Sequence, residues 1–239
     1  MTQIELQMHN LRLQGMAQSW KLLSETRRTH ELTLNQGLEL LLQAEEQDRT
    51  QKRFERLIKS AHFRYQASIE ELVFSAARAL EKSLINELTM GKYIENGESV
   101  LISGASGCGK SFLASALGHQ ACSQGKSVGY YNAQKLLTMT KLSRLDGTHI
   151  KLFEKLAKTD LLILDDFGLT RLEGSQQIDL MEIVEDRHGK MATIIASQLP
   201  VSKWYEIIGE ATIADAILDR LVHTSYRIEL KGESLRKKL

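Results

Sequence analysis

The sequence contains one proline, two cysteines and no long apolar run. Cys108 and Cys122 form no CxxC pair, which argues against a disulfide framework or a structural zinc site. No stretch approaches the roughly 18 apolar residues that span a membrane. The first ten residues also lack the basic and apolar segments of a secretion signal. We therefore expect a cytoplasmic protein with no membrane partner.

An excess of charge of one sign is also missing, because the formal net charge is only +1 over 239 residues. Such a balance creates no global field that attracts nucleic acid, so a DNA-binding surface must be a local patch. The 42% hydrophobic and 26% charged residues are typical of a folded chain. A chain of this length can bury one sizeable core and still carry a smaller appendage.

The sequence pattern differs between the first part of the chain and the rest. Residues 1–65 carry apolar residues at helical spacing and only two glycines, Gly15 and Gly37, which predicts a small all-helical N-terminal domain. We expect this domain to contact DNA or a partner, on the basis of its basic residues and of the resemblance described below. Residues 66–97 are interpreted as a connecting segment. Residues 98–239 alternate short apolar strands with helices, which indicates an α/β domain with a parallel sheet flanked by crossover helices. The strands are predicted at residues 100–103, 127–131, 161–165, 193–197 and 226–230.

A glycine-rich loop lies between the first predicted strand and a helix. Residues 104–111 read GASGCGKS and fit the phosphate-binding pattern GxxxxGK[ST] completely. Glycines allow successive backbone N–H groups to point at phosphates, and the helix N-terminus adds partial positive charge. Lys110 is predicted to neutralise the β- and γ-phosphates, and Ser111 to bind Mg²⁺. The predicted nucleotide-binding residues are Gly104, Ala105, Ser106, Gly107, Cys108, Gly109, Lys110, Ser111 and Phe112.

A second element supports a nucleotide site. Residues 161–166 read LLILDD, an apolar strand that ends in two carboxylates about 55 residues after Lys110. Proteins with a phosphate-binding loop hold Mg²⁺ with a carboxylate at such a position. We predict that Asp165 lies on the metal side and that Asp166 polarises the attacking water. Taken alone, an acidic pair at the end of a buried strand would carry no function, but its spacing from the glycine-rich loop favours the catalytic interpretation.

Together with three further segments, these motifs resemble the IstB-like AAA+ ATPases that assist transposases of insertion sequences. The segments are residues 192–200 (ATIIASQLP), 218–221 (LDRL) and 231–236 (KGESLR). DnaC-type helicase loaders are close relatives of that family. The resemblance implies an AAA+ P-loop core without a C-terminal helical lid domain, with ATP and Mg²⁺ as cofactors.

The resemblance also assigns roles to residues outside the two motifs. Gln198 occupies the position of a polar sensor of the γ-phosphate, where asparagine is usual. Arg220 matches the arginine that one subunit supplies to the nucleotide of its neighbour, which requires a homo-oligomer. Arg236 matches a tail residue that approaches the nucleotide. The predicted catalytic residues are Lys110, Asp165, Asp166, Gln198 and Arg220.

The resemblance implies a regulator of transposition that oligomerises on duplex DNA without sequence preference, under the control of ATP. It would recruit or stimulate a transposase. A replicative helicase loader is the alternative, and a small-molecule kinase is a weaker one. Two clusters of cations could neutralise DNA phosphates, although solvated helix faces explain them equally well. One comprises Lys135, Lys141, Arg144, Lys151, Lys155 and Lys158, and the other Arg49, Lys52, Arg53, Arg56, Lys59 and Arg64.

Overall fold

The computed structural model describes residues 2–235, which form two compact units that meet between Arg56 and Leu57. The boundary lies inside the long helix α3 (Leu34–Ala61). We predicted that the helical N-terminal domain ends at residue 65, whereas the chain from Leu57 onward packs within the larger unit. One reason is Phe63, whose ring packs against His119 and Tyr130 of that unit.

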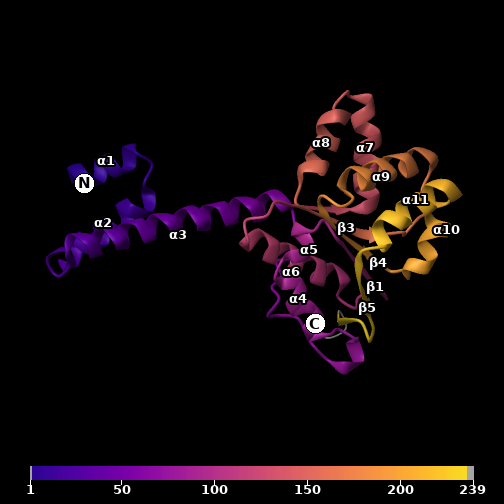
Figure 1. Cartoon of the computed structure of the whole chain (residues 1–239), viewed down its shortest axis with the longest axis horizontal. Helices are drawn as coiled ribbons and strands as arrows, with labels where there is room; N and C mark the ends of the chain where they lie inside the picture. The colour runs from indigo at the N-terminus through magenta and orange to yellow at the C-terminus, as the bar shows by residue number, and fades with distance from the viewer. Residues whose placement is uncertain (1, 236–239) are drawn as a thin grey trace. The chain divides into compact units, whose positions relative to one another are not determined.

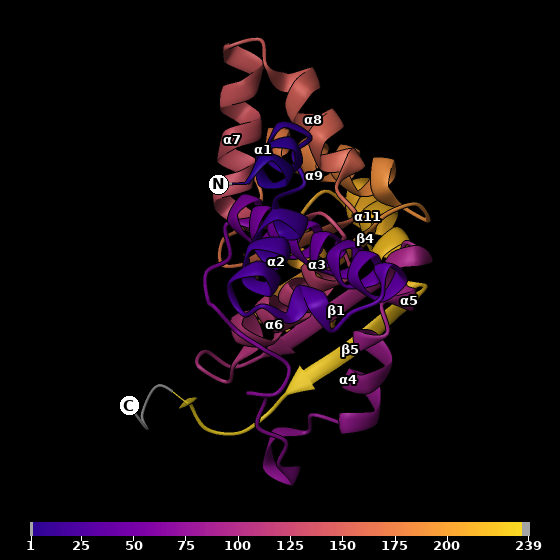
Figure 2. The same cartoon turned by 90° about the vertical axis from the view of Figure 1, so that its left-hand side faces the viewer.

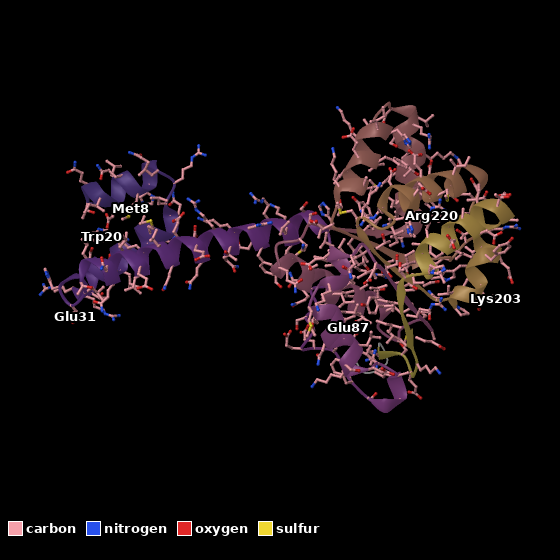
Figure 3. All side chains as sticks on the ribbon, in the orientation of Figure 1. Met8, Trp20, Glu31, Glu87, Lys203 and Arg220 are labelled. Atoms are coloured by element: carbon pink, nitrogen blue, oxygen red, sulfur yellow. The ribbon has the colours of Figure 1, made fainter. Side chains whose placement is uncertain are left out.

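The smaller unit is entirely helical, as its sequence pattern predicts. Its first helix begins with a capping box, in which the Thr2 hydroxyl accepts from the backbone of Glu5 and the Glu5 carboxylate accepts from the backbone of Thr2. Figure 3 labels Met8 and Trp20, which pack against its small apolar core. Its helices are α1 (Gln3–Asn10), α2 (Gln14–Glu25), the 3₁₀ turn η1 (Arg28–His30) and the first part of α3.

The larger unit contains a five-stranded parallel sheet in the order β2-β3-β4-β1-β5 (Figure 1), and this confirms the predicted fold class. Figure 2 shows β1 and β5 side by side. Its elements are η2 (Ala76–Arg78), α4 (Lys82–Thr89), α5 (Lys92–Glu95), β1 (Ser99–Gly104), α6 (Lys110–Ser123), β2 (Val128–Asn132), α7 (Ala133–Leu145), α8 (His149–Lys158), β3 (Leu161–Phe167), α9 (Gly174–Arg187), β4 (Ala192–Ser197), η3 (Val201–Lys203), α10 (Trp204–Ile208), α11 (Ala211–Val222) and β5 (Ser225–Leu230).

The register of the strands brings their carboxyl ends to one edge of the sheet. Asn132 at the end of β2 pairs with Asp165 of β3, and Gly104 at the end of β1 pairs with Leu230 of β5. Ser197 at the end of β4 pairs with β1. In open parallel sheets ligands bind at this edge, where the strand order reverses. The fold therefore places the glycine-rich loop and the acidic pair at the same edge of the sheet.

The core of the larger unit lies between the sheet and its helices. Residues of β3 and β4 are almost completely buried, as expected for strands that are covered on both faces. The Phe167 and Trp204 rings meet edge-on with centroids 4.9 Å apart. Arg187 is also buried, and burial lowers its pKa to about 10. Its guanidinium donates to the carbonyls of Leu156, Thr159 and Ala192, so it fixes the amino edge of the sheet.

Helices α7 and α8 lie side by side in both Figure 1 and Figure 2, and α9 packs against both of them. Helices α7 and α8 connect β2 to β3 and carry several exposed apolar side chains. Within residues 2–235, no helix has the length and apolar character needed to cross a membrane. The exposed apolar residues on this helical pair are Met139, Leu142, Leu145 and Ile150.

Candidate nucleotide-binding site

The glycine-rich loop adopts a backbone that only glycine accommodates without strain. Gly104, Gly107 and Gly109 have φ angles of 147°, 83° and 94°. A Cβ on Gly104 would lie 2.3 Å from the carbonyl oxygen of Leu230, so an alanine there would separate β1 from β5. The loop leads directly into α6, whose first residue is Lys110. This is the strand–loop–helix arrangement that the sequence predicts.

Side chains of the loop converge on its centre. Lys110 is only 6% exposed, and its Nζ donates to the carbonyl oxygen of Ala105 at 2.9 Å. The Cys108 thiol donates to the same oxygen, so this buried cysteine helps to hold the conformation of the loop. The Ser111 hydroxyl donates to Oδ1 of Asp165 at 3.0 Å. A hydroxyl beside a carboxylate is the hard oxygen set that Mg²⁺ prefers, so these residues fit the metal that the resemblance implies.

A bulge in β3 sets the direction of the acidic pair. The pairing of β3 with β4 shifts between Leu164 and Phe167, and Asp166 takes a φ of 57°. Bulges of this kind redirect side chains near active sites. Asp165 is 1% exposed and faces Ser111, whereas Asp166 is half-buried. The two carboxylates can therefore take different roles, one toward the metal and one toward water.

Two residues of β2 donate hydrogen bonds to the acidic pair, and no motif in the sequence points to them. The Tyr130 hydroxyl donates to Oδ2 of Asp165 at 2.5 Å. Burial raises the pKa of Tyr130, and the bond to Asp165 raises it further, so this phenol remains a neutral donor. The Asn132 amide donates to Oδ2 of Asp166 at 3.2 Å. The signal that could have found them was strand order, because the ends of two adjacent parallel strands must meet.

Arg64 also contacts both carboxylates. We counted it in a basic cluster that could bind DNA, but its Nη1 donates to Oδ2 of Asp166 at 2.9 Å and to Oδ2 of Asp165 at 3.3 Å. Burial lowers the pKa of Arg64, but the nearby Tyr65, Asp166 and Asp165 outweigh this and raise it. Arg64 precedes Asp165 by 101 residues and lies outside regular secondary structure. No local pattern could have predicted this contact.

An apolar pocket of about 230 Å³ opens beside the glycine-rich loop. It is smaller than the roughly 300–1,000 Å³ of complete ligand sites, so it suits one part of a larger ligand. Arg78 borders it and donates to the carbonyl oxygen of Cys108, and the backbone of Leu235 donates to Gly107 at 3.0 Å. The pocket is lined by Glu71, Leu72, Val73, Arg78, Leu80, Gly109, Phe112, Leu113, Leu230 and Leu235.

The residues assigned only by the resemblance form no hydrogen bond or ion pair with the loop or the acidic pair in the described part of the chain. Gln198 follows β4, is exposed and makes no side-chain hydrogen bond within residues 2–235, so its sensor role stays a prediction. Arg220, labelled in Figure 3, lies on α11 and forms an ion pair with Glu185 of α9. Its Nη1 also donates to the carbonyl oxygen of Ala216 at 2.9 Å. Arg236 falls outside the described residues.

Some cations of the two basic clusters form ion pairs within the chain. Arg144 pairs with the buried Asp179 and with Glu182, so it fixes α7 to α9. Several others are neutralised by an acidic residue on the same helix. These pairs are Arg49 with Glu45, Lys52 with Asp48, and Lys158 with Glu154.

The sequence and the fold were both compared with known proteins. The chain is 43% identical over 230 residues to an insertion sequence ATP-binding protein of Sinorhizobium fredii, a match that covers 96% of this chain and 94% of the relative. It is 42% identical over 204 residues to the insertion sequence IS1162 ATP-binding protein of Pseudomonas fluorescens, covering 84% and 88%.

Solved structures share the fold of the larger unit. The DnaC helicase loader matches with a TM-score of 0.57 at 18% identity, over 70% of this chain and 98% of the loader. The replication initiator DnaA bound to AMPPCP and single-stranded DNA matches with a TM-score of 0.58 at 19% identity, over 72% and 52%. At these identities the likeness shows the AAA+ P-loop fold alone.

The family comparison covers nearly the whole chain. A model of the family described as IstB-like ATP binding protein matches residues 6–239, which include the helical unit as well as the sheet. The relatives cited above match over most of their own length, so the likeness is not confined to the P-loop. The chain therefore belongs to the family of IstB-like AAA+ ATP-binding proteins.

Proposed function

We propose that this chain binds and hydrolyses ATP as an AAA+ regulator of the transposition of an insertion sequence. One observation carries the proposal, which is the convergence of Lys110, Ser111 and Asp165 at the carboxyl edge of the sheet. The names of the relatives, which are ATP-binding proteins of insertion sequences, supply the biological setting.

The site divides the chemistry among its residues. The loop amides would cradle the phosphates, and Lys110 would exchange the carbonyl of Ala105 for a phosphate oxygen. Ser111 and Asp165 would hold Mg²⁺, which when bound neutralises charge on the phosphates. Asp166, held by Asn132, would orient the attacking water and accept its proton.

The apolar pocket beside the loop would hold the base. Its lining residues come from three segments of the chain, which lie before β1, around the start of α6, and at and after the end of β5. A flat aromatic base would bury apolar surface against Leu72, Phe112 and Leu230, while its phosphates reach the loop at Gly109. Since the pocket is small, the ribose and phosphates would lie outside it.

Arg220 would act on a neighbouring subunit. It precedes β5, and Ser225 at the start of β5 pairs with Ser99 at the start of β1. Gly104 and the phosphate-binding loop lie at the other end of β1. A strand of six residues spans about 17–20 Å, which is beyond the reach of one arginine side chain. The guanidinium would therefore stabilise transition-state charge on the nucleotide of a second copy, and hydrolysis would require an oligomer.

Duplex DNA and a transposase are the proposed partners. The exposed lysines of α7 and α8 that lack an ion pair among the described residues offer a surface for DNA phosphates. They are Lys135, Lys141, Lys151 and Lys155. A helicase loader remains the alternative, and its support is the fold shared with DnaC, whereas the relatives with the highest identities cited above come from insertion sequences.

ATP turnover by the purified full chain, with duplex DNA, with single-stranded DNA and without DNA, tests the proposal. Lys110→Ala serves as the control, because it removes the phosphate-binding cation. We expect turnover that duplex DNA stimulates and that the variant loses. Stimulation by single strands alone would support the helicase loader. Absence of both nucleotide binding and turnover would refute the proposed function.

A further inference from the structure

Among the contacts that the proposed mechanism does not use, that of Arg64 is the most specific. One guanidinium nitrogen donates to a carboxylate oxygen of Asp165 and to one of Asp166, at 3.3 and 2.9 Å. We propose that Arg64 is a resident counter-ion of this acidic pair that competes with Mg²⁺, so that metal binding displaces it. This inference rests on the proposed function, because it concerns the metal side of the same nucleotide site.

The geometry places Arg64 on the carboxylate that would also hold Mg²⁺. Asp165 receives Ser111 on Oδ1, and it receives Tyr130 and Arg64 on Oδ2. Mg²⁺ held between Ser111 and Oδ1 would therefore lie across a single carboxylate from the guanidinium. Like charges at that separation repel each other, and the carboxylate of Asp165 that lies between them is almost fully buried. Arg64 and Mg²⁺ consequently favour different states of the site.

The same contact weakens Asp166 as a partner for water. Asp166 receives both Arg64 and Asn132 on Oδ2, so two donors already occupy the oxygen that could accept from a water. Departure of Arg64 would leave the amide of Asn132 to orient the carboxylate. One acceptor position of Asp166 would thus become free for water when nucleotide and metal are bound.

Arg64 can leave without disturbing the core. Its side chain is 42% exposed and belongs to an irregular segment that follows α3. The neighbouring Phe63 ring anchors that segment, since its centroid is 4.4 Å from that of His119 and 6.1 Å from that of Tyr130. The Tyr65 ring lies 5.6 Å from the guanidinium carbon, so the cation has an aromatic neighbour besides the acidic pair. A rotamer change of Arg64 would vacate the carboxylates while Phe63 keeps the segment in place.

Binding of a fluorescent ATP analogue to the full chain, titrated with Mg²⁺ and repeated in EDTA, tests the inference. For Arg64→Ala we expect the half-saturating Mg²⁺ concentration to fall by about tenfold or more, because a competing charge is gone. Binding in EDTA should stay unchanged. Arg64→Lys keeps a cation but carries it on a shorter side chain, so it should shift in the same direction by less. Arg56→Ala removes an exposed arginine from α3 and should leave the titration unchanged.

A second readout needs no nucleotide. Mg²⁺ alone should raise the melting temperature of Arg64→Ala more than that of the unmodified chain, because only the variant leaves the acidic pair without its cation. The inference would be overturned if Arg64→Ala and the unmodified chain showed equal Mg²⁺ dependence in the binding titration and in the melting comparison. Loss of nucleotide affinity to the same degree with and without Mg²⁺ would also overturn it, by making Arg64 a phosphate ligand. If the unmodified chain binds no nucleotide, the proposed function fails, and the melting comparison still decides the role of Arg64.

Discussion

Substitution of Arg220 separates a structural role from action on a neighbouring subunit. In the structure Arg220, whose side chain is 25% exposed, pairs with Glu185, whose side chain is 54% exposed. Ion pairs that are open to solvent contribute about 0–1 kcal/mol to stability. An arginine supplied to a transferring phosphoryl group contributes about 10³–10⁵ in kcat, or about 4–7 kcal/mol of transition-state stabilisation. Arg220→Ala should therefore leave folding and ATP binding nearly unchanged while it removes almost all turnover.

Mixing two inactive variants provides the decisive assay. Arg220→Ala keeps an intact phosphate-binding loop, and Lys110→Ala keeps an intact Arg220. Random assembly of equal amounts would place an intact loop beside an intact arginine at about a quarter of the interfaces of a cyclic oligomer. The mixture should therefore regain about a quarter of the turnover, whereas each variant alone stays inactive. Continued inactivity of the mixture, or normal turnover by Arg220→Ala alone, would refute action in trans.

Three further predictions test other parts of the molecule. Gly15→Ala would place a Cβ 2.3 Å from a carbonyl oxygen of α3 and should lower the melting temperature, whereas Gly37→Ala, with open space, should stabilise the helix by about 0.5–1 kcal/mol. Burial raises the pKa of Glu45, but hydrogen bonds from an arginine and backbone amides outweigh it and lower the pKa. Its stabilisation is present above the unfolded pKa of about 4.3 and is lost as pH falls through the lower folded value, so the melting gap between the unmodified chain and Glu45→Gln should close in acid. Charge reversal of Lys141 and Lys151 should reduce the salt dependence of DNA binding by about 2 in slope, and an unchanged slope would exclude α7 and α8 as the DNA surface.

Contiguous features could be predicted from the sequence. The loop from Gly104 to Ser111 is recognisable because its glycines, lysine and serine must follow one another between a strand and a helix. The five strands were predicted for the same reason, since covered parallel strands read as short apolar runs. Asp165 followed from its position at the end of such a strand. These inferences need only neighbours in the chain.

Features that depend on tertiary contacts were harder to predict. Tyr130 and Asn132 could have been proposed once β2 was placed beside β3, because the ends of adjacent parallel strands coincide. Arg64 could not, since its position depends on an irregular segment that is anchored by Phe63. Charge alone also left the role of Arg144 open, and the fold assigns it to an ion pair with the buried Asp179. A cation in a sequence has no assigned partner until the fold supplies one.

Arg64 and Arg220 share one property, which is that carboxylates of their own chain hold both of them. Arg64 lies on the acidic pair at the carboxyl edge of the sheet, and Arg220 lies on Glu185 of α9. Assembly with ATP would break both contacts, the first through Mg²⁺ and the second through the nucleotide of a neighbour. Glu185→Gln should therefore release Arg220 at little cost in stability and raise turnover at subsaturating protein concentration. If Glu185→Gln and the unmodified chain show the same turnover at every protein concentration, the Glu185 pair does not restrain Arg220.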